Sequence, residues 1–425
     1  MTLPVIGFAG MTHLGLVSGV SASEKGFRLV CYDPDTERIS NLKRGKFPVS
    51  EPQLEELVTK NKDRLTFTEN AADFQGCDVV YVATDVATDD YGKSDLTIIN
   101  TLLDRVFAAV RADTVVVVLS QVPPGFTRGK MRSDRILYYQ VETLIFGRAV
   151  ERALYPERYI VGCKDPTQPL PRAYAMFLQA HDCPILPMRY ESAELAKISI
   201  NMCLVASVGV ANTMAELCEQ TGADWSEIVP ALKLDRRIGK YSYLSPGLGI
   251  AGGNLERDLA TVLAIAKRHT TDAGIVAAWV ANSRYRKDWT WRTLEKLVLS
   301  TNRDAKIAVL GLAYKEDTHS TKNSPSLVLL SHLDGYSVVV YDPIVSPQSA
   351  GVAFKAASSS LAAVEGADVV CIMTPWAEFK KLLVSDIAKR MSGRILIDPF
   401  RVIDPAAAKL AGLQHVTLGV SSTAS

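Results

Sequence analysis

The stretch PVIGFAGMTHLG, residues 4–15, begins as a short apolar run and then breaks into a glycine-containing turn. A helical stretch follows it, and RLVCYDPD, residues 28–35, supplies a second apolar run that ends at an acidic residue. The order strand, turn, helix, strand is that of a βαβ unit, whose two strands lie parallel in one sheet. This segment therefore predicts an α/β fold with helices packed on both faces of a mostly parallel sheet.

The same order returns near the other end of the chain. KIAVLGLAYK, residues 306–315, is followed by a helical stretch and then by SVVVYDPIV, residues 337–345. The echo continues because GCDVVYVAT, residues 76–84, matches GADVVCIMT, residues 366–374. We therefore expect an internal duplication that gives two Rossmann-like, doubly wound parallel-sheet domains. The alternative is that any two α/β domains look alike at this level of detail.

A long helical segment separates the two similar ends. Residues 191–222 contain no proline and finish at Gly222, a residue suited to a helix C-cap. At 1.5 Å per residue such a helix would be roughly 45 Å long, enough to connect two domains. The predicted organisation is an N-terminal domain, a central helical region with this long connecting helix, and a C-terminal domain. Their expected boundaries are residues 1–188, 189–298 and 299–425.

Composition excludes several classes of protein. The 425 residues include 22% charged and 48% hydrophobic side chains, with a formal net charge of +1, so we expect no nucleic-acid partner. No apolar run reaches the length of a membrane span and no signal peptide is recognised, so we expect no membrane association and a cytoplasmic location. The seven cysteines and six histidines are scattered, which fits reduced thiols and gives no support for a metal site.

The first glycine turn is the candidate cofactor site. A dinucleotide-binding turn reads G-x-G-x-x-G, and here Thr12 stands at the middle glycine. Its Cβ would crowd the pyrophosphate, although its hydroxyl could donate to a phosphate oxygen. Asp33 stands where a carboxylate holds the ribose hydroxyls and repels the extra phosphate of NADP, so NAD is expected; the alternative is a turn residue before Pro34. The expected cofactor-binding residues of the turn are Gly10, Met11, Thr12, His13, Leu14 and Gly15.

An ordered set of motifs resembles the UDP-glucose/GDP-mannose dehydrogenase family from residue 4 to about residue 402. The motifs are GKFPVSEPQLEELV (45–58), SQVPPGFTR (120–128), SAELAKISIN (192–201), DRRIG (235–239), GLAYKEDTHSTKNSP (311–325) and TPWAEF (374–379). The resemblance implies an NAD domain, a central helical region and a C-terminal domain that binds a nucleotide sugar, with a UDP-sugar favoured. It also implies a homodimer whose central helices pair.

The resemblance extends to catalytic residues. In the family, a lysine and an asparagine matched by Lys197 and Asn201, with an aspartate matched by Asp258, bind a water and handle the alcohol proton. Lys197 and Asn201 are four residues apart and would share one helix face. Glu142 matches a glutamate that assists thioester hydrolysis. In GIAGGNLERD, Asn254 stands at the position of the family's cysteine nucleophile.

Asn254 changes the expected chemistry. The family oxidises a primary alcohol to an acid in two hydride transfers, through a thiohemiacetal and a thioester that asparagine cannot form. Asparagine is a good N-cap, so we expect Asn254 to cap the helix that follows. The expected reaction is a single oxidation of a sugar alcohol, most simply at C6, to a carbonyl. Four-electron oxidation without a thioester, and nucleotide-sugar binding without catalysis, are the alternatives.

The remaining matches concern binding. By resemblance, Thr84, Gln121 and Lys322 lie at the cofactor and Lys315 contacts the sugar nucleotide; the alternative for both lysines is solvated loop charge. Arg237 matches an arginine that reaches the sugar site of a neighbouring subunit. The glycine loop before Asn254 is expected to bring backbone amides against the sugar. Its glycines are Gly247, Gly249, Gly252 and Gly253.

Overall fold

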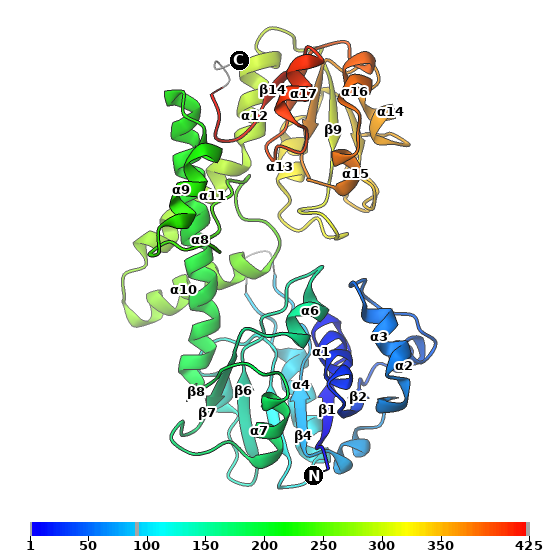
Figure 1. The fold of residues 1–425 in the computed structure, drawn as a ribbon, viewed down its shortest axis with the longest axis vertical. Coiled ribbons are helices and arrows are strands. Elements are labelled where there is room, and N and C mark those ends of the chain that lie inside the picture. Colours follow the sequence, from blue (N-terminus) through cyan, green and yellow to red (C-terminus); the bar gives the residue numbers. More distant parts are fainter. Residues whose placement is uncertain (1, 90–92, 422–425) are drawn as a thin grey trace. The chain divides into compact units, whose positions relative to one another are not determined.

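The computed structural model describes residues 2–89 and 93–421. By the packing of its backbone the chain divides into two compact units, Met1–Ile200 and Asn201–Ser425. In Figure 1 the first unit runs from blue to green and the second from green to red.

The first unit is built on an eight-stranded sheet. Its strands are β1 (Val5–Ala9), β2 (Arg28–Tyr32), β3 (Leu65–Thr68), β4 (Val79–Val82), β5 (Val115–Val118), β6 (Ile136–Gln140), β7 (Tyr159–Cys163) and β8 (Ile185–Arg189). They lie in the order β3-β2-β1-β4-β5-β6-β7-β8. Every neighbouring pair is parallel except β6 and β7, which pair antiparallel.

Helices cover both faces of this sheet. They are α1 (His13–Glu24), α2 (Thr36–Lys43), α3 (Leu54–Lys60), α4 (Thr97–Ala109), α5 (Phe126–Gly129), α6 (Ala149–Leu154) and α7 (Arg172–Gln179), with the 3₁₀ turns η1 (Lys62–Arg64) and η2 (Ala71–Gly76). One apolar cluster joins Phe8 of β1 to Val17 of α1, and another joins Ala9 of β1 to Val106 of α4. Strands β4 and β5 are buried along their whole length, as expected for inner strands covered on both sides.

The second unit holds a six-stranded, wholly parallel sheet. Its strands are β9 (Lys306–Leu310), β10 (Ser337–Tyr341), β11 (Lys355–Ala356), β12 (Val369–Ile372), β13 (Ile395–Ile397) and β14 (Gln414–Val416). Its helices are α13 (Pro325–His332), α14 (Ser360–Val364), α15 (Ala377–Lys380), α16 (Val384–Arg390) and α17 (Pro405–Leu410). The order β11-β10-β9-β12-β13-β14 repeats β3-β2-β1-β4-β5-β6 of the first sheet strand for strand. The two predicted Rossmann-like domains are confirmed.

The central helices lie between the two sheets in the sequence. They are α8 (Tyr190–Thr221), α9 (Trp225–Leu234), α10 (Asn254–His269), α11 (Gly274–Lys287) and α12 (Trp289–Leu294), which continues into a π-helical turn, η3 (Glu295–Leu299). The predicted long connecting helix is α8, with 32 residues. Contrary to the expectation from sequence, α8 is long and apolar enough to span a membrane by composition alone, with a best mean hydropathy of 1.5. The same composition occurs in helices that pack against other protein.

Candidate functional site

The candidate cofactor turn joins β1 to α1. Gly10 has φ +97°, in the left-handed region, and its N–H donates to the carbonyl of Tyr32 at 2.8 Å. A Cβ on Gly15 would lie 1.8 Å from the carbonyl oxygen of Gly10, so only glycine lets the helix start this close to the turn. The start of α1 is thus set directly behind the end of β1, the placement that binds a pyrophosphate in dinucleotide folds.

Thr12 fits the turn without backbone strain. It occupies the N-cap position of α1 with φ −80°, and its side chain makes no capping hydrogen bond. Its Oγ1 instead accepts the N–H of Asp85 at 2.9 Å, which ties the turn to the loop after β4. Met11 and Leu14 are buried and hold the turn from behind. The middle position therefore does not need glycine for its conformation, and the crowding of a ligand by Thr12 stays a prediction.

Asp33 follows β2 and is 2% exposed. Its Oδ2 accepts the N–H of Met11 at 2.6 Å and Nη1 of Arg38 at 2.8 Å, and its Oδ1 accepts the N–H of Asp35 at 2.9 Å. A carboxylate offers about four acceptor positions, so Asp33 retains room for a ribose hydroxyl. The contact between Arg38 and Asp33 was not predicted from the sequence. It could have been, because Arg38 lies in the first turn of α2, a helix that Asp35 caps shortly after Asp33.

A surface hollow adjoins this acid. Its volume is about 260 Å³, and it is lined by Asp35, Glu37, Arg38, Asn41, Lys46, Phe47 and Pro48. The hollow combines a guanidinium, an ammonium and an aromatic ring beside the predicted ribose acid.

Thr84 and Gln121 follow the neighbouring strands β4 and β5. The carbonyl of Thr84 accepts a hydrogen bond from Ser120 Oγ at 2.6 Å, which joins the two loops. Thr84 is 4% exposed and Gln121 is half-buried. Because β1, β4 and β5 are parallel, these two residues lie at the same edge of the sheet as the candidate cofactor turn, and their contact with NAD stays a prediction.

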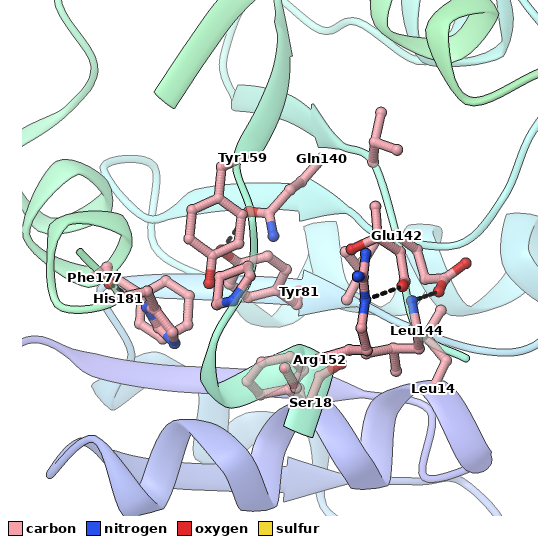
Figure 2. A pocket seen from close by; sticks show the side chains of 16 residues that line it. Leu14, Ser18, Tyr81, Gln140, Glu142, Leu144, Arg152, Tyr159, Phe177 and His181 are labelled. Atoms are coloured by element: carbon pink, nitrogen blue, oxygen red, sulfur yellow. Dashed lines mark hydrogen bonds between the residues drawn. The ribbon is translucent and has the colours of Figure 1, made fainter. Parts of the chain in front are cut away.

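Glu142 and Lys197 form an ion pair. Glu142 lies in the loop after β6 and Lys197 on α8, with 3.4 Å between Oε2 and Nζ and side chains 17% and 13% exposed. Glu142 Oε1 also accepts the N–H of Leu144, which turns the carboxylate back on its own loop (Figure 2). A carboxylate and an amine this close can pass a proton between them. Sequence reasoning named both residues without predicting their contact.

A small cavity lies behind Glu142 (Figure 2). It measures about 50 Å³, enough for a few waters and too little for a nucleotide sugar. Its wall includes Gln140, whose Oε1 accepts hydrogen bonds from Tyr81 and Tyr174 at 2.9 and 3.0 Å. Burial lowers the pKa of His181, on the same wall, to about 4. All the residues that line this cavity belong to the first unit.

Asn201 and Asp258 meet in the second unit. Nδ2 of Asn201 donates to Oδ2 of Asp258, and the two residues are 7% and 2% exposed. Nε of Arg257 lies 3.4 Å from the other carboxylate oxygen. The structure therefore brings together two of the residues that the sequence assigned to the catalytic water. Arg257, which supports them, was not predicted.

Asn254 does not cap α10. Gly253 occupies the N-cap position, and Asn254 is the first helical residue, without a side-chain capping bond. The chain enters the helix through Gly252, at φ +80°, and Gly253, so the helix begins at Asn254, one residue earlier than an Asn254 cap predicts. The prediction that Asn254 is a cap is therefore wrong, while its place at the end of the glycine loop stands.

Much of the glycine loop is shaped by neighbouring protein. A Cβ on Gly249, at φ +79°, would lie 2.3 Å from the carbonyl oxygen of Ser283 on α11. The N–H of Gly247 donates to Asn212 Oδ1 at 2.8 Å, and that of Gly252 donates to the carbonyl of Lys322 at 2.9 Å. Within the described residues, the amides of Ala251 and Gly253 make no hydrogen bond. Contact of this loop with a sugar stays a prediction.

The loop between β9 and α13 packs on the glycine loop. The ring of Tyr314 lies so close to Gly252 that a Cβ there would be 3.0 Å away. Nδ2 of Asn323 donates to the carbonyl of Gly252 at 3.2 Å. The same loop carries Lys315, 6.0 Å above the ring of Tyr314, and Lys322. The two lysines assigned to ligands thus lie on a segment fixed against the loop that ends at Asn254.

Arg237 stands apart from these residues. Its side chain is 88% exposed and pairs with Asp235 at 2.6 Å. The sequence placed it at the sugar site of a second subunit, and in the single chain it extends into solvent.

The cysteines offer no nucleophile in the glycine loop. Five of the seven are buried, Cys183 is half-buried and Cys203 is exposed on α8. Burial raises the pKa of Cys31, Cys77 and Cys371 to about 12, so these remain thiols. Among the described residues, no group of three or more His, Cys, Asp or Glu side chains is placed to hold a metal ion.

Three family models match the chain in succession. They describe the NAD-binding domain, the central domain and the UDP-binding domain of the UDP-glucose/GDP-mannose dehydrogenase family, over residues 4–178, 191–284 and 308–405. The UDP-glucose 6-dehydrogenase of Pseudomonas aeruginosa is 30% identical, with 99% of this chain and 97% of that protein covered. The UDP-glucose 6-dehydrogenase of Rickettsia typhi is 28% identical, with 97% and 99% covered.

Solved structures agree with these matches. A UDP-glucose dehydrogenase from Pyrobaculum islandicum superposes with a TM-score of 0.84 at 25% identity, with 96% of each chain covered. A UDP-D-ManNAc dehydrogenase from Pyrococcus horikoshii gives a TM-score of 0.82 at 24% identity, with 97% and 99% covered.

Proposed function

Because the chain belongs to the UDP-glucose/GDP-mannose dehydrogenase family, an NAD-dependent oxidoreductase family acting on nucleotide sugars, we propose that it oxidises the C6 primary alcohol of a UDP-sugar by one hydride transfer to NAD. The UDP-binding domain and relatives named UDP-glucose 6-dehydrogenase support a UDP-hexose as the substrate and C6 as the reacting carbon. The product of one transfer is an aldehyde.

The residue at the start of α10 carries this proposal. Where the family places its cysteine, this chain has Asn254, preceded by the two glycines of the loop. An amide does not add to an aldehyde to give an intermediate that NAD can oxidise as a thiohemiacetal can. Cys77 does not replace the missing thiol, because it is buried and protonated. The first carbonyl product is therefore held by non-covalent contacts alone.

The proton steps are assigned to α8 and its partners. When bound, NAD supplies the hydride acceptor. The ammonium of Lys197 first passes a proton to the carboxylate of Glu142, 3.4 Å away, and the resulting neutral amine takes the alcohol proton through a water as the hydride leaves. Asn201 stands one turn further along α8 and is held by Asp258. In this proposal Asn201 orients the water.

We further propose a cytoplasmic homodimer that pairs through the central helices. Val210, Met214 and Leu217 are 55%, 40% and 51% exposed and follow one another at helical spacing along α8. A second copy would cover this stripe, and Arg237 extends into solvent where it can reach a neighbouring subunit. The domain boundaries 1–188, 189–298 and 299–425 are proposed on the same family resemblance.

Incubation of the purified protein with NAD and a panel of UDP-sugars, read by mass spectrometry, tests the proposal. We expect a carbonyl product that hydroxylamine traps as an oxime. A uronic acid as the first detectable product would favour four-electron oxidation of the aldehyde hydrate. Binding of UDP-sugars without any NADH would favour a non-catalytic role.

A further inference from the structure

Glu51 joins two parts of the cofactor side of the first unit. It precedes α3, and its side chain is 1% exposed. Its Oε1 lies 2.9 Å from Nε2 of His13 and accepts the N–H of Gly147 at 3.0 Å. Its Oε2 accepts the N–H of Ala149 at 3.2 Å. One buried carboxylate therefore contacts the first residue of α1 and the loop that leads from Glu142 to α6.

An aromatic contact reinforces this junction. The ring of Phe146 stacks on the imidazole of His13 with 4.2 Å between ring centroids and 17° between planes. Phe146 is 45% exposed, whereas His13 is buried. The ring of Phe146 therefore covers His13 at the start of α1 and leaves part of its own surface in contact with solvent. Because Glu51 fixes Nε2 of His13, it also fixes the plane on which Phe146 packs.

The loop itself is a compact piece of structure. The carbonyl of Thr143 accepts Nε of Arg152 at 3.3 Å, and the N–H of Arg148 donates to the carbonyl of Ile145 at 2.9 Å. Glu142 closes one end of the loop on Leu144, and Glu51 closes the other at Gly147. Hydrogen bonds therefore hold this loop near both of its ends.

We infer that Glu51 is a positioning residue that holds the start of α1, where NAD binds, and residues 142–149 as one body. Binding of NAD at the turn then fixes the loop that carries Glu142. The inference rests on the proposed function for the role of Glu142, whereas the coupling of the turn to the loop can be measured without turnover.

Glutamine cannot replace Glu51 in this role. The carboxylate serves three neighbours with two acceptor oxygens. A glutamine has one acceptor oxygen, and its amide NH₂ would face an N–H of the loop. At least one buried donor would lose its acceptor, and the loop would be released from the turn.

A matched control exists in the second unit. Asp398 is fully buried, and its Oδ2 lies 3.2 Å from Nε2 of His415 and accepts the N–H of Ile403 at 2.8 Å. Asp398→Asn removes the negative charge of this buried acid–histidine pair without touching the cofactor turn. This control variant measures how much stability is lost when a buried acid–histidine pair far along the chain from the cofactor turn is disturbed.

Hydrogen exchange of residues 142–149, with and without NAD, tests the coupling in the whole protein. We expect NAD to slow exchange of this segment in the wild type and in Asp398→Asn, and to have no such effect in Glu51→Gln. The Kd of NAD should rise roughly tenfold in Glu51→Gln. If NAD still protects the segment in Glu51→Gln as it does in the wild type, the inference is overturned.

Phe146→Ala provides a second variant if Glu51→Gln does not fold. It removes the stacked ring without leaving a buried polar group, and we expect a smaller loss of NAD-induced protection. Unchanged protection in this variant would also overturn the inference.

Kinetics separate this inference from the proposed function. In an active enzyme, Glu51→Gln should lower kcat in the wild-type background and lower it no further in Glu142→Gln. If instead the two substitutions lower kcat by independent factors that multiply in the double variant, Glu51 does not act through Glu142. Absence of turnover with every UDP-sugar would refute the proposed function, while exchange and NAD binding would still decide the inference.

Discussion

Gly10 and Gly311 directly follow the first strands of the two halves and have nearly the same backbone geometry, at φ +97° and +100°. Their N–H groups donate to Tyr32 and Tyr341 at 2.8 and 2.7 Å. The two halves differ in the residues that follow. In the first half α1 begins at His13, three residues after Gly10, whereas in the second half α13 begins only at Pro325. The first half therefore presents a helix N-terminus at the sheet edge, as its match to an NAD-binding domain requires. The second half inserts a loop there, and that loop carries two lysines.

The aspartates that follow the second strand of each half also differ, in the number of hydrogen bonds that they accept. Asp342 accepts five hydrogen bonds from its own half, at 2.7 to 3.1 Å. Asp33 accepts three. A carboxylate has about four acceptor positions, so Asp342 is saturated by structure and Asp33 is not. One sequence pattern thus gives a structural acid in the second half and, in the first, an acid that keeps an acceptor position for the predicted ribose hydroxyl.

The largest expected effect concerns the start of α1. Gly15→Ala puts a Cβ against the Gly10 carbonyl, and we expect a loss of about 3 kcal/mol of stability or more, together with loss of NAD binding. Thermal unfolding and NAD titration measure both. Gly19→Ala on the same helix is the control, because its Cβ would meet Cys31 Sγ at an ordinary 3.4 Å. Normal NAD binding by Gly15→Ala would show that α1 is not set by this contact.

Replacing each of the two aspartates by asparagine tests whether one serves stability and the other serves NAD binding. Asp342→Asn should cost about 2 kcal/mol of stability and leave the Kd of NAD unchanged. Asp33→Asn should raise the Kd of NAD about tenfold or more, because a charge-assisted hydrogen bond to the ribose is lost. Isothermal titration and urea unfolding distinguish these outcomes. If both variants weakened NAD binding equally, the distinction between the two acids would fail.

Acid should weaken the first half through His181. Burial lowers the folded-state pKa of His181 to about 4, below an unfolded value near 6.5. The stability that neutral His181 allows is fully present above pH 6.5. It declines as the pH falls towards 4, because His181 then binds a proton in the unfolded chain but not in the folded one. We expect about 2 kcal/mol less stability at pH 4.5 than at pH 7 from this residue. Urea unfolding of His181→Gln at both values should show a smaller difference than the wild type.

The smallest expected effect is at Thr12. Thr12→Gly removes a Cβ near the predicted pyrophosphate, at the cost of the hydrogen bond from Asp85. We expect the Kd of NAD to fall a few-fold, an effect of about 1 kcal/mol. An unchanged or higher Kd would mean that threonine does not crowd the cofactor.

The duplicated fold could be predicted because its signals are local. Apolar runs that end in Gly10 or Gly311 mark strand and turn within a few residues. Arg38 and Glu51 escaped notice because their roles depend on contacts made only after folding. Glu51 lies 38 residues from His13 and 96 from Gly147 in the chain.

Two interpretations near Asn254 show the limit of pattern reading. The dihedral angles of Gly252 and Gly253 decide that α10 begins at Asn254 itself, the residue expected to cap it. Gly249 looked like a residue for sugar contact, yet its missing Cβ first makes room for the carbonyl of Ser283. In both cases the sequence located the loop, and the packing around it decided what each residue does.

The number of NADH molecules formed per UDP-sugar at complete conversion tests the central claim most directly. With Asn254 in place of the thiol, the account predicts one NADH and an aldehyde. Asn254→Cys should raise the count towards two if Glu142 is placed to assist hydrolysis. Two NADH and a uronic acid from the unaltered protein would contradict the account.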